Sequence, residues 1–331
     1  MTKWPPRPRL AASFYKAHGL GNDYLVFEEG DDWWATEENV RAVCHPHRGV
    51  GSDGIVVLLD DSGRVAGGAV RERSPDLSAS PSALAEGSEA GPGEPLEASV
   101  RVRLRMFNPD GREFERSGNG LRVLASYLMR LRPALREMDV EVGGARVRMV
   151  GRGRDGGVYD VSVDMGRAVT GPGAVGLDTG ALDPHGRLAG PDGLPLELVP
   201  VSVGNPHAVV VCDDDQVTEE RLASIGPFLA THDAFRHGTN VQLARPDGEA
   251  GCRALIWERG VGRTSASGTS ACAVAVALVS RGMVRPGEVE VAMPGGSLRV
   301  TVTPELDVVL RGPVEEVMEG RVATGLLARL S

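Results

Sequence analysis

Nine consecutive apolar residues, at positions 271–279, constrain the fold of this chain more than any other feature. Their composition predicts a helix over Gly268–Ser280 that is apolar on every face. Other elements must enclose such a helix, and the run is too short to cross a bilayer. The sequence therefore predicts a core built around one internal helix in the carboxy-terminal half.

A matching segment lies in the other half of the chain. Ser117-Gly118-Asn119-Gly120 precedes a predicted helix over Gly118–Leu131, just as Ser267-Gly268-Thr269-Ser270 precedes the apolar helix. In both segments a serine stands at the start of a helix whose first backbone N–H groups have no partner within the helix. Such helix starts attract anions, so two of them facing each other could hold one carboxylate between two serine side chains.

Strands account for most of the remaining pattern. Alternation over residues 100–106 predicts a strand whose Arg101, Arg103 and Arg105 face solvent. Two more helices, with threonine N-caps, are expected at Glu37–Cys44 and Glu219–Ala230. Many strands and one internal helix in each half predict the α+β class, with two curled sheets that each wrap round their own helix. Further strands are expected at residues 24–27, 55–59, 159–163, 197–203, 208–212, 254–257, 289–292, 298–302 and 307–310.

Composition narrows the classes of function. With 331 residues, 41% of them hydrophobic, the chain can bury a substantial core and form two domains. A net charge of -9 argues against nucleic acid as a partner, and we recognise neither a membrane span nor a signal peptide. The four cysteines are scattered, so we expect reduced thiols in a cytoplasmic protein.

The predicted division is an N-terminal half-domain over residues 1–163, a C-terminal half-domain over 164–317, and a tail over 318–331 that returns to the first half. Residues 61–97 are rich in Gly, Ser, Pro, Ala and acidic side chains. Such a composition buries too little apolar surface to offset its ordering entropy. We therefore expect this segment to be a mobile insertion.

Six polar segments point to a small-molecule site. Singly, each is typical of a turn, because Asn, Asp and Gly tolerate left-handed backbone. Together with the two helix starts, their four asparagines and one arginine suit the carboxylate and ammonium groups of a small amino-acid substrate. The segments are GLGND from Gly19, RGVGSDG from Arg48, FNPDG from Phe107, GNPH from Gly204, TN from Thr239 and ERG from Glu258.

The order of these motifs resembles the diaminopimelate epimerase family of cofactor-independent amino-acid racemases and epimerases. The match rests on KAHGLGNDY, HRGVGSDG, FNPDG followed by SGNG, GNPH, ERGVGRT leading into SGTSAC, and the late PGGSL. The resemblance implies two pseudo-symmetric domains, each a curled, mostly antiparallel sheet wrapped round a central helix, with the active site between them. It implies neither a metal nor pyridoxal phosphate as a cofactor.

The resemblance also implies roles for individual residues. The acid/base positions of the family fall on Ser117 and Ser267, with His207 and Glu258 each beside one of them. The implied reaction interconverts LL- and meso-2,6-diaminopimelate, a lysine and peptidoglycan precursor, by proton transfer on opposite faces of the α-carbon. Implied substrate contacts are Asn22, Asn108, Gly118, Asn119, Asn205, Asn240, Glu258, Arg259, Gly268 and Thr269.

This sequence departs from the family at both acid/base positions, where serine stands in place of cysteine. A thiol has a pKa of about 8.5, which a helix N-terminus lowers further, whereas a serine hydroxyl is a far weaker acid. Cys272 does not take over this role, because it lies more than one turn inside the apolar helix. We expect Cys272 to be a core residue.

Three functions stay open on the sequence. The chain is a diaminopimelate epimerase in lineage and role, or a cofactor-free isomerase of another amino acid that uses Glu258 or His207 as base. In the third alternative, it binds an amino acid without turning it over. A homodimer is compatible with the sequence, which leaves the oligomeric state open.

Overall fold

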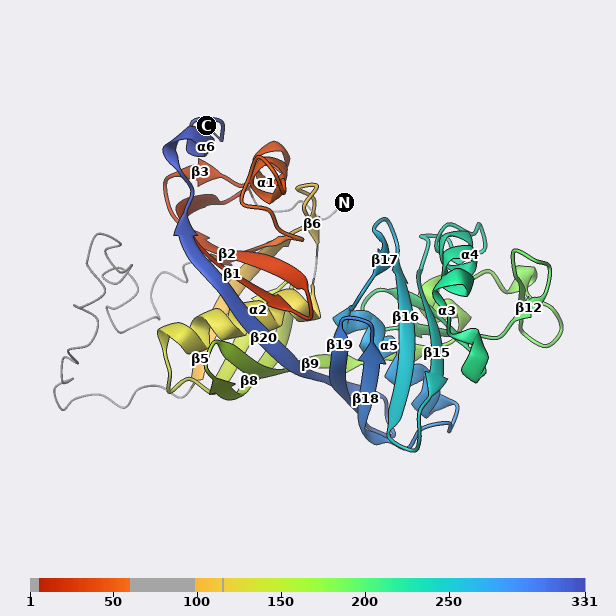
Figure 1. Cartoon of the computed structure of the whole chain (residues 1–331). Helices are drawn as coiled ribbons and strands as arrows, with labels where there is room; N and C mark the ends of the chain where they lie inside the picture. The colour runs from red at the N-terminus through yellow and green to blue at the C-terminus, as the bar shows by residue number, and fades with distance from the viewer. Residues whose placement is uncertain (1–5, 60–98, 115, 331) are drawn as a thin grey trace.

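The computed structural model describes residues 6–59, 99–114 and 116–330, so the predicted insertion at 61–97 lies outside the described residues. The chain forms two lobes that lie side by side (Figure 1). Strand β20 (Asp307–Arg321) connects them, because it pairs with β19 (Gly296–Val302) near its start and with β1 (Arg9–Gly19) near its end. Since β20 belongs to both lobes, the domain boundaries at residues 163 and 317 stay a prediction.

The amino-terminal lobe is a curled sheet with one helix inside and one outside. Helix α2 (Gly118–Leu131) shares its core with Tyr24 and Val26, whereas α1 (Glu37–Cys44) packs with Leu25 and Phe27 on the opposite face of the same strand. The strands of this lobe are β1, β2 (Asn22–Glu29), β3 (Trp33–Trp34), β4 (Ile55–Leu59), β5 (Ser99–Phe107), β6 (Glu113–Phe114), β7 (Glu137–Val142), β8 (Ala145–Asp155) and β9 (Val158–Arg167).

The carboxy-terminal lobe repeats this plan. Helix α5 (Gly268–Ser280) lies inside the sheet, and α4 (Glu219–Ala230) covers its outer face. The strands of this lobe are β13 (Leu198–Ser202), β14 (Pro206–Val211), β15 (Asn240–Pro246), β16 (Gly251–Glu258), β17 (Gly262–Thr264), β18 (Gly287–Met293) and β19. Shorter elements are β10 (Val169–Thr170), α3 (Pro172–Val175), β11 (Leu188–Ala189), β12 (Pro195–Leu196) and, after β20, α6 (Thr324–Leu327).

Strand pairing follows the same order in both lobes. In the first, β2 and β4 are parallel on either side of α1 in the chain, and β5 and β7 are parallel on either side of α2. In the second, the parallel pairs are β14 with β15, around α4, and β16 with β18, around α5. The connecting pairs, such as β4–β5 and β15–β16, are antiparallel. The predicted α+β class, with two pseudo-symmetric and mostly antiparallel domains, is confirmed.

All four predicted helices are present with the predicted bounds. Thr36 and Thr218 act as N-caps of α1 and α4, each accepting a hydrogen bond from a backbone N–H in the first turn. Helix α5 is enclosed as its composition requires, because every residue from Ala271 to Leu278 has 0% of its surface exposed.

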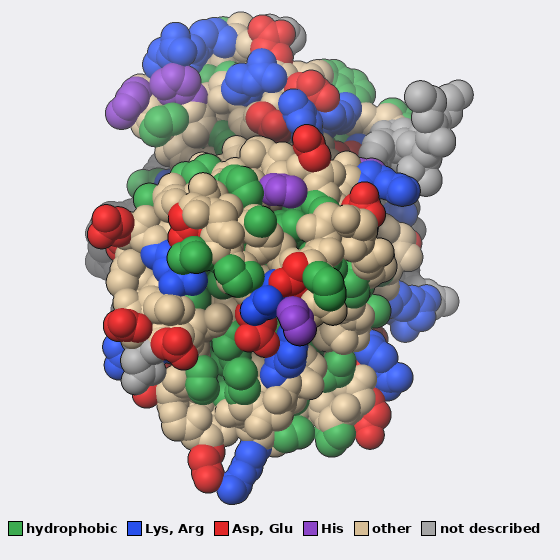
Figure 2. All heavy atoms as spheres, turned by 90° about the vertical axis from the view of Figure 1, so that its right-hand side faces the viewer, with side chains coloured by type: hydrophobic (Ala, Val, Ile, Leu, Met, Phe, Trp, Pro, Cys, Tyr) green, Lys and Arg blue, Asp and Glu red, His purple; other side chains and the backbone are tan. Residues whose placement is uncertain are grey.

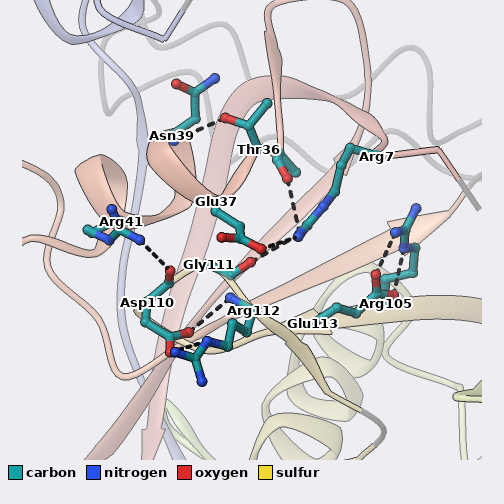
Figure 3. Close-up of polar contacts among 11 residues, drawn as sticks. Arg7, Thr36, Glu37, Asn39, Arg41, Arg105, Asp110, Gly111, Arg112 and Glu113 are labelled. Carbon is teal, nitrogen blue, oxygen red and sulfur yellow. Dashed lines mark hydrogen bonds and ion pairs between the residues drawn. The ribbon is translucent and has the colours of Figure 1, made fainter. Parts of the chain in front are cut away.

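The prediction that Arg105 faces solvent is wrong. Arg101 and Arg103 are exposed, but Arg105 is buried and forms a bidentate pair with Glu113 at 2.7 and 2.5 Å (Figure 3). Strand β6 folds back on the end of β5 and brings Glu113 to the guanidinium, whose buried charge it compensates. Alternation therefore predicted the face on which Arg105 lies, but not the strand that covers this face.

No helix in the described ranges is long and apolar enough to span a membrane. On the face that Figure 2 shows, Lys and Arg side chains are interspersed with Asp and Glu. Nucleic-acid-binding surfaces concentrate basic side chains, which this face does not.

The contact of β20 with both inner helices gives a stability prediction. Leu310 is fully buried on β20, so Leu310→Ala is expected to lower the free energy of unfolding by about 3 kcal/mol through lost burial and a cavity. Val317, on the same strand, is 50% exposed, so Val317→Ala should change the free energy of unfolding by less than about 0.5 kcal/mol. Urea unfolding measures both, and equal losses in the two variants would contradict this account of the core.

Candidate active site

The first residues of α2 and α5 meet where the two lobes touch. A Cβ atom built on Gly268 would lie 3.8 Å from the backbone nitrogen of Asn119 and 3.9 Å from the carbonyl carbon of Gly118. A Cβ atom on either glycine would also approach Leu310 Cδ2 to within 2.8 or 2.9 Å. Glycine at both positions therefore lets the two helix N-termini converge on one side chain of β20.

The two helix starts differ in how their serines are used. Ser117 Oγ accepts a hydrogen bond from the backbone N–H of Gly120 at 3.1 Å, which is the usual N-cap contact. Ser267 is the N-cap residue of α5, but its side chain makes no cap hydrogen bond. The first N–H groups of α5 thus keep their capacity to bind an anion, and the Ser267 hydroxyl is available for another partner.

That partner is Glu258. Its carboxyl group accepts a hydrogen bond from Thr264 Oγ1 at 3.1 Å and is hydrogen-bonded to the Ser267 side chain. Burial raises the pKa of Glu258 above its ordinary value, although these two hydrogen bonds oppose the shift. A carboxyl group with a raised pKa beside a hydroxyl is suited to accept a proton through that hydroxyl.

Ser117 has a different neighbour. The hydroxyl of Tyr24 is hydrogen-bonded to the Ser117 side chain, and burial raises the pKa of this phenol. Tyr24 is therefore neutral at neutral pH, and its hydroxyl can donate a hydrogen bond but is not a base. The two faces of the site thus pair one serine with a carboxylate and the other with a phenol.

His207 lies apart from both serines in the hydrogen-bond network, fully buried on β14. Its Nε2 lies 2.9 Å from Asn205 Oδ1, and its Nδ1 lies 3.0 Å from Gln242 Nε2, which also donates to Ser270 on α5. Burial lowers the pKa of His207 to about 3, so the ring is neutral at neutral pH. These contacts favour a role in orienting Asn205, and the proton-transfer role of His207 stays a prediction.

In the amino-terminal lobe, Asn22 and Asn119 bind each other. Asn119 Nδ2 donates to the backbone carbonyl of Asn22 at 2.6 Å and to its Oδ1 at 2.7 Å, while Asn22 Nδ2 donates to Asp53 at 3.1 Å. Asp53 also accepts from the backbone N–H of Asp23, whose carboxylate pairs with Lys16 at 2.6 Å. This network fixes the loop that carries Asn22, so the residues of KAHGLGNDY and GSDG form one unit.

Asn240 plays a similar linking part in the other lobe. Its side chain donates to the carbonyl of Pro206 at 3.1 Å and accepts from the backbone N–H of Arg259 at 2.9 Å. It therefore joins the GNPH and ERG segments, because parallel pairing already places His207 opposite Asn240. The predicted residues Asn205, Asn240, Glu258, Arg259 and Ser267 thus come together at one edge of the sheet.

Asn108 follows the end of β5 at the corresponding edge of the first lobe. It opens a turn in which the Gly111 N–H donates to its carbonyl at 2.8 Å. Figure 3 shows how α1 and the chain before β1 hold this turn: Arg7 donates to the Gly111 carbonyl, and Arg41 donates to that of Asp110. The FNPDG segment is therefore a rigid support for Asn108.

A cavity of about 10 Å³, roughly the room for one water molecule, lies between the GLGND turn, the starts of α2 and α5, and β19. Leu20 closes one side, with a Cβ on Gly296 falling only 2.7 Å from its Cδ2, so the GLGND turn packs on the PGGSL turn. The lining residues are Gly19, Leu20, Asn22, Asn119, Arg122, Ala266, Ser267, Gly268 and Leu298. An amino acid needs more room, so its binding requires these lobe-to-lobe contacts to open.

A larger cavity, of about 940 Å³, lies elsewhere in the carboxy-terminal lobe, between Leu196, Cys212 and Ile225. It contains none of the predicted site residues, although Cys212, Asp213 and Arg221 line it. We therefore place the candidate site at the small cavity, which is lined by Asn119 from the start of α2 and by Ser267 and Gly268 from the start of α5.

The cysteines do not form a second site. Cys272 is fully buried, and burial raises the pKa of its thiol to about 12, as expected for a core residue. All four cysteines are free and buried. Within the described residues, no group of three or more His, Cys, Asp or Glu side chains is arranged to hold a metal ion.

Tyr24, Asp53 and Arg122 were not predicted from the sequence as site residues. Tyr24 and Asp53 were inside the quoted motifs, but their partners, Ser117 and Asn22, are distant in the chain. Arg122 had a visible signal, because it is a charged residue one turn after Gly118 on the helix that the sheet encloses.

Solved structures share this fold. A predicted epimerase from Pseudomonas aeruginosa has a TM-score of 0.60 at 18% identity, over 94% of this chain and 99% of that one. A hydroxyproline epimerase from Agrobacterium vitis, solved with bound trans-4-hydroxy-L-proline, has a TM-score of 0.59 at 15% identity, over 94% and 92%. By its fold, this chain falls in a class of two-lobed proteins that includes these two epimerases.

Sequence comparison identifies the family within that class. A family model described as diaminopimelate epimerase matches residues 199–317. The diaminopimelate epimerase of Synechococcus sp. (strain JA-2-3B'a(2-13)) is 31% identical over 327 residues, covering 96% of this chain and 99% of that protein. That of Desulforudis audaxviator (strain MP104C) is 33% identical over 316 residues, covering 93% and 98%. The chain belongs to the diaminopimelate epimerase family.

The lowered pKa of His207 gives a pH prediction. In the unfolded chain this histidine binds a proton below about pH 6.5, whereas in the folded protein it does so only near pH 3. The contribution of neutral His207 to the free energy of unfolding is therefore present above pH 6.5 and is lost as the pH falls toward 3. His207→Gln, which does not titrate, should therefore lose less stability than wild type between pH 7 and pH 4, as measured by urea unfolding. His185 is exposed, and His185→Gln should run parallel to wild type. A His207→Gln curve that is also parallel would contradict this assignment.

Proposed function

We propose that this chain is an isomerase that interconverts LL- and meso-2,6-diaminopimelate, with the reacting carboxylate held between the N-termini of α2 and α5. The observation that carries the proposal is the close approach of Gly118 and Gly268, which brings the first N–H groups of both helices together. Membership in the diaminopimelate epimerase family, at 31 to 33% identity over nearly the whole chain, supports the substrate.

In this proposal the protein's own groups carry the proton transfers. Loss of the α-proton leaves a carbanion whose charge spreads onto the carboxylate, where the helix N–H groups stabilise it. On one face Ser267 Oγ takes the α-proton while its own proton passes to Glu258, so that Glu258 becomes a neutral carboxylic acid and Ser267 is unchanged. The raised pKa of Glu258 makes this carboxylate a stronger base than an ordinary glutamate.

On the other face Ser117 Oγ donates a proton to the α-carbon and is hydrogen-bonded to the Tyr24 hydroxyl. This step leaves an alkoxide or a phenolate, which lies far higher in free energy than a thiolate at neutral pH. We therefore expect inversion to be slower than removal and return of the proton on the Glu258 face. The same Glu258–Ser267 pair would also serve a second candidate function, the epimerisation of another amino acid.

We further propose a cytoplasmic location, which four free and buried cysteines favour. A homodimer stays a prediction.

Exchange of the α-proton for deuterium in heavy water tests the proposed function, with LL- and meso-diaminopimelate followed by NMR and chiral separation. Wild type is expected to exchange faster than it inverts. Glu258→Gln and Ser267→Ala should each slow exchange by about 100-fold, because they remove the base and its relay. Ser280, at the far end of α5, donates to a helix carbonyl, and Ser280→Ala should leave both rates unchanged.

Restoring the family residues gives a complementary test. The double variant Ser117→Cys with Ser267→Cys should raise the rate of inversion by about 100-fold or more, since a thiol pair can be ionised near neutral pH. If neither wild type nor the double variant exchanges the α-proton although diaminopimelate binds, diaminopimelate is not the substrate. Exchange of another amino acid in the same assay would then favour the second candidate.

A further inference from the structure

The most unusual charged group near the site is Arg122. It lies on α2 one helical turn after Gly118, and 1% of its surface is exposed. Its Nη2 donates to Asn119 Oδ1 at 3.1 Å and its Nη1 donates to the carbonyl of Pro313 at 3.3 Å. Its buried Nε has no hydrogen-bond partner. In the described part of the chain, no carboxylate lies within ion-pair distance of its guanidinium.

Such a group is costly in a protein interior. A buried charge without a partner destabilises the fold by several kcal/mol, and an apolar side chain of similar volume is often the more stable choice. Burial lowers the pKa of Arg122 only to about 10, so the guanidinium is still charged at neutral pH. Arg105 shows how the charge of a buried arginine is usually compensated, because its guanidinium pairs with the carboxylate of Glu113.

The backbone around Arg122 leaves room for this side chain. A Cβ atom on Gly312 would lie 2.4 Å from Arg122 Nη1, and one on Gly19 would lie 2.8 Å from its Nη2. Arg122 also lines the small cavity together with Asn119, Ser267 and Gly268. Two glycines from different strands thus accommodate a cation at the wall of the site between the two helix starts.

The positive charge of Arg122 has no equivalent on α5, although the two lobes are pseudo-symmetric. Arg122 is five residues after Ser117, and the residue five after Ser267 is Cys272, which is neutral and buried. The proposed function needs an anion between the two helix starts, yet only one helix adds a full positive charge. The charge of Arg122 therefore belongs to the amino-terminal side of the site.

We propose that Arg122 is the positioning residue and fixed counter-charge of a carboxylate-binding site between the two helix starts. It acts through Asn119, whose amide it orients, and through its charge at the cavity wall. It thereby selects an anionic carboxylate over a neutral group and offsets the additional negative charge that develops when the α-proton leaves. This inference rests on the proposed function for its natural substrate, but the carboxylate site can be tested without it.

The test compares the unfolding midpoint in sodium formate with that in sodium chloride at equal ionic strength. Formate is the smallest carboxylate and therefore needs the least opening of the cavity, and a ligand that binds only the folded state raises the midpoint. Wild type should be stabilised more by formate than by chloride. Arg122→Gln keeps a hydrogen-bonding amide beside Asn119 without the charge, and should lose most of this difference. Arg122→Lys, which keeps the charge, should retain part of it.

Arg130 supplies the matched control. It lies on the same helix and pairs with Glu316 and Glu319, away from the cavity, so Arg130→Met removes the same charge and should keep the wild-type formate effect. If Arg122→Gln does not fold, Arg122→Met replaces it in the same comparison. A wild-type formate effect in the neutral Arg122 variant, or an equal loss in Arg130→Met, would overturn the proposal.

Calorimetric titration with meso-diaminopimelate separates this inference from the proposed function. Arg122→Gln is expected to weaken binding at least tenfold, and Arg122→Lys to weaken it less. If formate binds through Arg122 but meso-diaminopimelate does not bind wild type, the proposed substrate fails and the carboxylate site stands. If meso-diaminopimelate binds wild type and Arg122→Gln equally well, the role of Arg122 fails and the proposed function stands.

Discussion

Two helix N-termini that point at each other set the electrostatics of this molecule. Each carries about half a positive charge, and the first turns of α2 and α5 contain no acidic side chain to offset it. Their approach is unfavourable unless an anion lies between them. The curled sheets, the two glycines and Leu310 nevertheless hold them together. The fold thus maintains a positive site that a carboxylate relieves.

The two helix starts occupy equivalent positions in the backbone, but the side chains around them differ. The same order of strands brings Ser117 and Ser267 to equivalent positions, but only Ser267 has a carboxylate beside it. Ser117 is used as an N-cap and is bonded to Tyr24. Serine makes such caps readily, so its presence stabilises the helix start while it weakens the acid/base chemistry available there. In the proposed function, the carboxylate-binding groups and the proton-transfer groups are therefore separable.

Much of the fold could be predicted from local pattern. The four helices had clear starts and strong periodicity, and their bounds were correct. Strands β1, β7, β8 and β15 were not predicted, because mixed polar sequences such as that of β8 form strands only through pairing with neighbours. The prediction that Arg105 faces solvent failed for a related reason, because the short strand β6, which pairs with the end of β5, was not predicted.

The sequence could name candidate site residues but not the contacts between them. Motif position identified Ser117, Ser267 and Glu258, whereas the pairing of Glu258 with Ser267 needed β16, β17 and the start of α5 in three dimensions. His207 shows the limit of motif-based assignment: its burial and its bonds to Asn205 and Gln242 decide its protonation, and neither is visible in the sequence.

A crystal structure of the protein with meso-diaminopimelate bound tests the central claim most directly. The account predicts one carboxylate of the ligand within hydrogen-bond distance of backbone N–H groups from both helix starts, at Gly118 or Asn119 and at Gly268 or Thr269. It also predicts the α-carbon between Ser117 Oγ and Ser267 Oγ. A ligand bound in the larger cavity near Cys212, or one whose carboxylate contacts only one of the two helices, would contradict it.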